Sequence, residues 1–211
     1  MENRILLKAR EVMVLNGVRY MTMDDLANQL GISKKTIYQF YKDKEALVIA
    51  VVELEMEEQR LKCERSHETA ENAVHEMFMV LEDIQNMFKK MNPHIVGELQ
   101  KYFPEAFKRI HDHKMKYMYG IVINNLSRGV QQGVYRKDID PEILVTYRLE
   151  TSLIPFDTNV FPLSKYDLGK VNHQIMEHFI YGLMSPEGLR LMEQYKLEKI
   201  NQPSAESFSE N

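Results

Sequence analysis

The sequence predicts an all-α protein made of a small amino-terminal domain and a larger helical one. Apolar residues recur at three- and four-residue spacing along most of the chain, and Gly, Pro and Asn mark the ends of these runs. No segment alternates polar and apolar residues as a strand would. With 211 residues, 44% of them hydrophobic, the chain can bury a substantial core.

The first predicted helix covers residues 3–16 and ends at Asn16-Gly17. Its apolar residues share one stripe, which comprises Ile5, Leu6, Ala9, Val12 and Met13. A face of this kind needs a partner, so we expect the helix to pack against the segment that follows.

Residues 22–47 predict two short helices joined by a tight turn, with a third helix starting directly after them. Thr22 can cap the first helix, with Asp25 three places on, and Gly31 can end it with a positive φ. Ser33 can cap the second helix, whose Ile37 turns inward while its polar residues face outward. This is a helix-turn-helix with a cationic second helix, the shape that enters a DNA major groove.

This segment resembles the amino-terminal domain of the TetR family of bacterial transcriptional regulators. The matching residues are Thr22, Leu26-Ala27, Gly31-Ile32-Ser33, Thr36-Ile37-Tyr38, Tyr41 and Lys44-Glu45-Ala46-Leu47. The sequence departs from the family pattern at Tyr41, most often Phe, at Phe40, often His or Tyr, and at Lys35, where Gly is common. The resemblance is specific for about residues 3–50, and it implies a three-helix DNA-binding domain over residues 1–48.

The predicted DNA contacts lie at the amino ends of helices and along the second helix of the motif. Lys34, Lys35 and Lys44 stand where the helix dipole also favours phosphate. The resemblance implies a phosphate contact for Tyr38, and Gln39 is our candidate for reading a base because an amide can bond adenine in a bidentate way. The full predicted set is Thr22, Ser33, Lys34, Lys35, Thr36, Tyr38, Gln39, Phe40 and Lys44.

Further helices follow through residues 49–200. Asp43 can cap a long helix to about Ser66, whose polar second half indicates a bridge between two domains. Apolar spacing and Pro or Gly breaks then predict helices over 67–91, 94–102, 105–132, 141–158, 166–184 and 186–199. The polar tail over 201–211 is predicted to be disordered.

Composition favours a cytoplasmic DNA-binding protein without metal or cofactor. Residues 1–50 carry eight Lys or Arg against six Asp or Glu, a net charge of +2, while the remainder carries −6. The single Cys63 suits a reducing cytosol, and we expect neither a secretion signal nor a membrane span. The histidine spacing matches no complete metal site, no Gly-rich phosphate loop is present, and no catalytic constellation can be argued, so we expect no enzyme.

The larger domain is rich in Met and Tyr, and two interpretations remain open. The residues could form an ordinary bundle core, or they could line a pocket for a small hydrophobic effector, as the resemblance implies. The predicted lining comprises Met77, Phe78, Leu81, Phe88, Phe107, Met115, Met118, Tyr147 and Thr151.

A homodimer is expected because one helix-turn-helix reads too few base pairs for useful specificity. The resemblance points to the helices over 141–158 and 166–184 as the interface, and the second of these shows two adjacent apolar rows. The predicted interface residues are Met176, Phe179, Ile180 and Leu183, unless both rows lie in the monomer core.

The sequence therefore predicts a transcriptional regulator, most simply a repressor, that binds a palindromic operator as a homodimer and is released by a small effector. Two alternatives remain. One is a helical ligand carrier or enzyme whose amino-terminal helices only pack, and the other is a regulator controlled by a partner protein.

Overall fold

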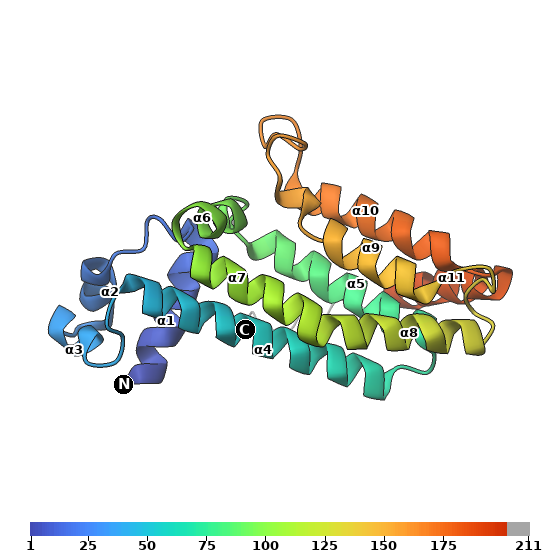
Figure 1. Cartoon of the computed structure of the whole chain (residues 1–211), viewed down its shortest axis with the longest axis horizontal. Helices are drawn as coiled ribbons and strands as arrows, with labels where there is room; N and C mark the ends of the chain where they lie inside the picture. The colour runs from blue at the N-terminus through green and yellow to red at the C-terminus, as the bar shows by residue number, and fades with distance from the viewer. Residues whose placement is uncertain (202–211) are drawn as a thin grey trace.

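The structure is a computed structural model that describes residues 1–201, so most of the predicted tail lies outside the described residues. It is an elongated all-α protein (Figure 1). The elements are α1 (Glu2–Asn16), α2 (Met23–Leu30), α3 (Lys34–Tyr38), α4 (Lys44–Thr69), α5 (Ala73–Lys90), α6 (Ile95–Tyr102), α7 (Pro104–His113), the π-helical turn η1 (Lys114–Met118), α8 (Tyr119–Gln131), α9 (Pro141–Thr151), the 3-10 turn η2 (Ile154–Phe156), α10 (Leu168–Leu183) and α11 (Pro186–Asn201).

The predicted caps of α2 and α3 are confirmed. Thr22 Oγ1 accepts a hydrogen bond from Asp25 N at 3.0 Å, and Ser33 Oγ accepts one from Thr36 N at 3.1 Å. Gly31 ends α2 at φ 66° and ψ 35°, a left-handed conformation that an L side chain rarely adopts. These local interactions fix the turn between α2 and α3.

Two separate hydrophobic cores lie at opposite ends of the molecule. The first core joins α1, α2, α3 and the start of α4, which we call the head, and it also takes in Ile95 and Leu99 of α6. The second core joins α5, α8, α9, α10 and α11, which we call the distal bundle. Helix α4 runs lengthwise from the head beneath the distal bundle, as its polar second half predicts (Figure 1).

The bundle helices differ from the predicted ranges where caps or turns intervene. The helix predicted over 67–91 begins only at Ala73, because α4 continues to Thr69 and Asn72 Oδ1 then accepts from His75 N at 2.9 Å. The helix predicted over 141–158 ends at Thr151, before the turn that contains Pro155. The helix predicted over 105–132 is interrupted by the π-helical turn η1. In a π-helical turn the backbone hydrogen bonds join residues five positions apart instead of four. The residues after the turn therefore lie on different faces of the helix from those that regular α-helical spacing predicts.

Candidate DNA-binding site and the helical interior

The helix-turn-helix has a polar outer surface and a buried apolar inner side. Leu26 and Ile37 are completely buried, and the small Ala27 is 5% exposed where α2 and α3 meet. On the outer side of α3, Lys34, Lys35 and Gln39 are exposed to solvent. The five-residue helix is thus held by one apolar side chain while its polar groups remain free to meet a partner.

Seven of the nine candidate DNA contacts are exposed, whereas Thr36 and Lys44 are half-buried, and some of them bond neighbouring side chains in the free protein. Lys34 Nζ lies 2.7 Å from Asp24 Oδ2, and this hydrogen bond raises the pKa of Lys34. The Ser33 and Thr36 hydroxyls lie 2.9 Å apart. Tyr38 and Phe40 are 43% and 40% exposed, so both rings stand out from the surface beside Gln39.

Lys44 occupies a different environment from the lysines of α3. It is the first residue of α4, and its Nζ donates to the Arg19 carbonyl at 3.2 Å and lies 5.5 Å from the centre of the Phe103 ring. Burial lowers the pKa of Lys44, while the Glu98 charge opposes that shift. The first backbone N–H groups of α4 still provide partial positive charge at this point.

Sequence reasoning missed a basic and aromatic surface beside Lys44. The Arg19 guanidinium lies 5.7 Å from the centre of the Tyr102 ring, and Lys101 Nζ lies 5.2 Å from the same ring. Tyr20 is 72% exposed at the same turn. The residues come from the α1–α2 turn and from α6, so no motif in the sequence could have placed them together.

Comparison with known proteins bears on this geometry. Residues 5–51 match the family described as bacterial regulatory proteins, tetR family, and this range covers most of α1, all of α2 and α3, and the start of α4. The HTH-type transcriptional regulator YvaF of Bacillus subtilis is 29% identical over 190 residues, which are 89% of this chain and 97% of YvaF. The amino-terminal segment of the chain thus belongs to the TetR family of transcriptional regulators. Its helix-turn-helix is therefore a DNA-binding domain, as the sequence predicted.

Solved structures share the fold along most of the chain. FadR of Bacillus subtilis, in complex with stearoyl-CoA, is similar with a TM-score of 0.62 and 21% identity, over 87% of this chain and all of that one. A TetR-family regulator of Cytophaga hutchinsonii is similar with a TM-score of 0.65 and 13% identity, over 87% and 94% of the two chains. The whole helical layout of this protein is thus a known one, and the relatives that it matches are transcriptional regulators.

The nine residues predicted to line a pocket do not all face one interior. Phe107 packs against the head core, and Met115 and Tyr147 are 41% and 52% exposed. Met115 faces outward because the π-helical turn breaks the regular spacing between it and Met118. For these three residues the predicted common lining is wrong.

The other six lie inside the bundle or beside it. Met77, Phe78, Leu81 and Met118 belong to the second core or pack against it. Phe88 packs on Phe156 with ring centres 5.2 Å apart, and Thr151 is half-buried. Ligand binding by these six residues stays a prediction.

The predicted interface residues also need correction. Met176, Phe179, Ile180 and Leu183 are only 2%, 8%, 1% and 1% exposed, because α5 and the second core cover them. Both apolar rows of α10 thus serve the chain's own core, which was the alternative that the sequence left open. The outward face of α9 instead shows Ile143 at 65% and Tyr147 at 52% exposure.

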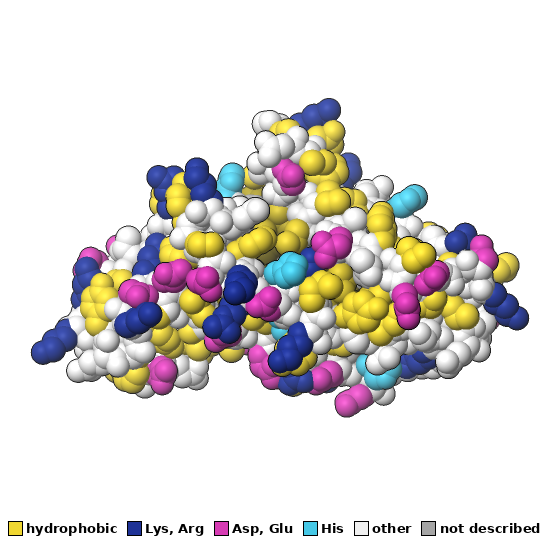
Figure 2. Space-filling model, viewed as in Figure 1, with side chains coloured by type: hydrophobic (Ala, Val, Ile, Leu, Met, Phe, Trp, Pro, Cys, Tyr) yellow, Lys and Arg dark blue, Asp and Glu magenta, His cyan; other side chains and the backbone are white. Residues whose placement is uncertain are grey.

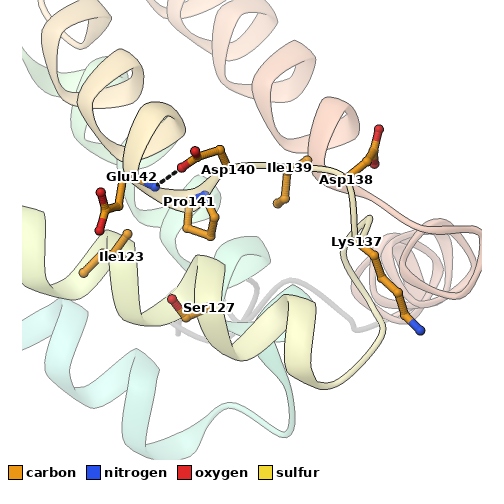
Figure 3. Close-up of a pocket in the computed structure, with 8 residues that line it drawn as sticks. All are labelled: Ile123, Ser127, Lys137, Asp138, Ile139, Asp140, Pro141 and Glu142. Atoms are coloured by element: carbon orange, nitrogen blue, oxygen red, sulfur yellow. Dashed lines mark hydrogen bonds between the residues drawn. The ribbon is translucent and has the colours of Figure 1, made fainter.

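Two surface cavities accompany these cores. One, of about 560 Å³, lies between α8 and the turn before α9, where Figure 3 shows Ile139 and Pro141 facing Ile123 and Ser127 while Lys137 and Asp138 point away. The other, of about 750 Å³, lies between α4 and the α7–η1 segment and includes Glu57, His113 and Tyr117 in its lining. Burial lowers the pKa of His113 there.

A buried polar network ties α5 to α8. Glu76 is 2% exposed, and its Oε2 accepts from Asn125 Nδ2 at 2.9 Å and from Arg128 Nη2 at 2.5 Å. The Tyr135 hydroxyl donates to Asn125 Oδ1 at 2.8 Å, and burial strongly raises its pKa. This network satisfies a carboxylate in the interior, and no sequence pattern indicated it.

Within residues 1–201 no three His, Cys, Asp or Glu side chains come together as metal ligands would. None of the helices in this range combines the length and the apolar character that crossing a membrane requires.

Proposed function

We propose that this protein is a TetR-family repressor that binds a palindromic operator as a homodimer and leaves it when a small effector binds the distal bundle. The observation that carries the proposal is the outward polar surface of α3, held on the buried Ile37 within the segment that matches the family. A short helix with Lys34, Lys35 and Gln39 outward fits a major groove, where lysines meet phosphates and an amide reads a base.

The dimer interface that we propose uses the solvent-exposed faces of α9 and α10. Ile143 and Tyr147 present apolar area on α9. On α10 the exposed Gly182 has no heavy atom within 4 Å of where a Cβ would lie, which leaves room for a close helix approach. Two such helices from each copy would form an isologous four-helix seam.

An effector in the distal bundle could act on the head through α4 and α6. Helix α6 shares the head core, and Glu98 Oε2 accepts from Arg19 N at 2.9 Å. Asn92 N donates to the Val14 carbonyl at 2.7 Å, which joins the start of the same region to the end of α1. Binding that displaces α6 would therefore move the head, and with it the spacing of two heads in a dimer. The stearoyl-CoA bound to FadR, a ligand with a long apolar chain, supports an effector that has an apolar part.

DNA retention by the purified protein tests the proposal directly. We expect specific binding to fragments of the DNA upstream of its own gene, with affinity that falls steeply with salt. Lys44→Ala should weaken binding to all sequences alike and reduce the salt slope by about one unit. Failure of the wild-type protein to prefer any fragment over random DNA would remove operator recognition from the proposal.

Charge placed on α9 tests the dimer. Ile143→Glu should give a folded monomer that has lost operator binding, measured by sedimentation and circular dichroism. Leu197→Glu on α11, where the leucine is 59% exposed, is the matched control and should stay dimeric. A dimeric Ile143→Glu protein with normal DNA affinity would place the interface elsewhere.

A further inference from the structure

The turn between α1 and α2 meets the end of α6 in a surface of cations and aromatic rings. We call it the flanking surface, and its residues are Arg19, Lys44, Lys101, Tyr102 and Phe103. The Arg19 guanidinium and Lys101 Nζ lie 5.7 Å and 5.2 Å from the centre of the Tyr102 ring, and all three side chains are exposed. Figure 2 shows Lys or Arg side chains gathered with apolar ones over α6.

The flanking surface is continuous with two of the candidate DNA contacts of the head. One of them, Lys44, belongs to both, because its Nζ donates to the Arg19 carbonyl at 3.2 Å and lies 5.5 Å from the centre of the Phe103 ring. The other, Thr22, caps α2 and follows Arg19 by three residues, a span of at most about 10 Å. Each strand of B-DNA carries a phosphate about every 3.4 Å along the helix axis. A strand that contacts Thr22 and Lys44 therefore has further phosphates within reach of Arg19.

The cations of the flanking surface have no carboxylate partner. Arg19, Lys44 and Lys101 form no ion pair within residues 1–201. Three other cations of the head each have such a partner, and these pairs are Lys8 with Glu11 at 2.9 Å, Arg10 with Glu58 at 2.6 Å and Lys34 with Asp24 at 2.7 Å. Glu98 touches the same turn, but its Oε2 accepts from the backbone N–H of Arg19 at 2.9 Å. Three cations against this one carboxylate leave a net charge of +2.

The Tyr102 ring holds two of these cations without using their hydrogen-bond donors. A cation over the face of a ring is attracted by the π electrons, and its N–H groups stay free for an acceptor. The ring also restricts the movement of both side chains, so less conformational entropy is lost when they bind. Positioned cations with free donors are the groups that bind the phosphates of a nucleic acid.

We propose that Arg19 and Lys101 bind DNA phosphates next to the segment that α3 enters, so that α6 is part of the DNA interface. The charge of +2 and the continuity with Thr22 and Lys44 favour the DNA backbone over a separate partner. Lys101 comes from α6 and Arg19 from the α1–α2 turn, so a shift of α6 against the head would separate the two contacts. The inference rests on the proposed function, because it extends the surface that binds the operator.

The salt dependence of DNA binding tests the contacts without knowledge of the operator. The full-length protein and its variants would be titrated with a random duplex of about 40 base pairs, roughly four turns of B-DNA. A phosphate contact contributes about 0.9 to the slope of log K against log salt. Arg19→Gln and Lys101→Gln should therefore each reduce the slope by about one unit for each bound head. Each should weaken binding about 5- to 10-fold at 0.1 M salt.

Two control variants separate a local contact from a change in net charge. Lys62→Gln removes one charge from an exposed lysine of α4 that lies 18 residues beyond Lys44, about 27 Å along the helix. This variant should keep the wild-type slope, because salt screens charges over about 10 Å at 0.1 M. Arg19→Lys keeps the charge and should also keep the slope. An equal reduction in Lys62→Gln would overturn the proposal.

A purely structural role of the flanking surface predicts a different result. If the ring contacts only hold α6 against the turn, Arg19→Gln should lower the melting temperature and leave the slope unchanged, which would overturn the proposal. We expect the reverse, a melting temperature close to that of the wild type and a reduced slope. If Arg19→Gln does not fold, the slope measured for Lys101→Gln decides.

Phosphate ethylation interference locates the contacts on an upstream fragment that the protein prefers. Ethylation removes the charge of a phosphate, so it weakens binding wherever that phosphate is contacted. The wild type should be sensitive at phosphates beside the segment that α3 enters, and Arg19→Gln and Lys101→Gln should lose this sensitivity. An identical pattern in all three proteins would overturn the proposal.

Failure of this inference and failure of the proposed function give different results. If a fragment is preferred and neither Arg19→Gln nor Lys101→Gln changes its affinity or slope, the flanking surface is overturned while operator binding stands. If no fragment is preferred but both variants reduce the slope on random DNA, operator recognition falls and the flanking surface stands. If the wild type binds no DNA at all, both are overturned.

Discussion

The head and the distal bundle keep their polar groups in different places. In the head every buried side chain is apolar apart from the ring hydroxyl of Tyr41, and the polar residues of α2 and α3 are outside. The buried polar residues within the described part of the chain all lie beyond residue 65, and they are Ser66, Glu76, Lys114, Asn125 and Asn172. The difference indicates two modes of recognition. The head meets its partner on its surface, whereas the bundle holds polar groups where only a small ligand or its own chain can reach them.

Breaking the buried network of the bundle should have the largest effect. Glu76→Gln removes the charge that faces Arg128, and the guanidinium then lacks its counterion. Because Arg128 is partly exposed, we expect a loss of about 3 kcal/mol in unfolding free energy, at the lower end for buried pairs. Urea denaturation measures this loss.

The exposed pair between Glu187 and Arg190 is the matched control for that prediction. Glu187→Gln should leave the unfolding free energy unchanged within error, because solvent screens an exposed pair. Equal losses of unfolding free energy in both variants would show that burial does not strengthen the interaction of Glu76 with Arg128. The different placement of polar groups in the head and the bundle would then have no effect on stability.

Substitution of an exposed side chain of the head should affect DNA binding and not stability. Gln39 is exposed at the end of α3, so Gln39→Ala should leave the melting temperature unchanged. If the amide reads a base, the variant should lose about 1–3 kcal/mol of preference at one base pair. Competition binding with single-base operator variants measures this preference. Equal losses on operator and random DNA would reject base reading by Gln39.

The same contrast explains which features the sequence could predict. In the head, Thr22, Gly31 and Ser33 act on residues no more than five positions away, so the caps and the turn are visible in the sequence. The inward Ile37 and the outward Lys34 follow from helical spacing alone. The bonds of Lys34 to Asp24 and of Lys44 to the Arg19 carbonyl cross between elements and could not be predicted.

In the bundle, helix existence could be predicted but burial could not. The spacing of Ile180 and Met176 shows that both lie on an apolar face of the helix. Only the packing of α5 against α10 reveals that the chain's own core buries both apolar rows, so that neither row is free to form a dimer interface. Met115 shows a second cause, since nothing in the sequence marks the π-helical turn that directs it outward. The pairing of Glu76 with Arg128 joins residues 52 positions apart, beyond the reach of any local pattern.

Loss of one cap should have a smaller effect on the head. Ser33→Ala removes the acceptor for Thr36 N and should lower the unfolding free energy by about 1 kcal/mol. Ser33→Asn keeps an acceptor at this position and should retain the stability, which thermal unfolding measures. If the alanine and asparagine variants are equally destabilised, the cap is not what holds α3.

The smallest expected effect is a pH dependence at the surface of the bundle, where Lys196 Nζ lies 2.7 Å from Glu177 Oε1. The hydrogen bond from Lys196 lowers the pKa of Glu177, against the opposing effect of burial. A carboxyl with a lowered pKa stabilises the fold above its unfolded value, near 4.5, and this contribution is lost as the pH falls through the folded value. Lys196→Met should therefore lower the unfolding free energy by about 0.5 kcal/mol at pH 7.

The difference between Lys196→Met and the wild type should shrink as the pH falls below about 4, where Glu177 becomes protonated in both proteins. His173 Nε2 also lies 3.7 Å from Glu177 Oε2, and it is present in both proteins, so it does not affect the comparison. Urea denaturation at pH 7 and pH 3 measures the change, with the exposed Lys170→Met as a control that should show none. The Lys196 ammonium also lies 4.9 Å from the centre of the Tyr181 ring. If the difference in unfolding free energy between the two proteins stays constant with pH, the effect of Lys196 comes from packing against this ring. The ion pair with Glu177 would then not stabilise the surface of the bundle.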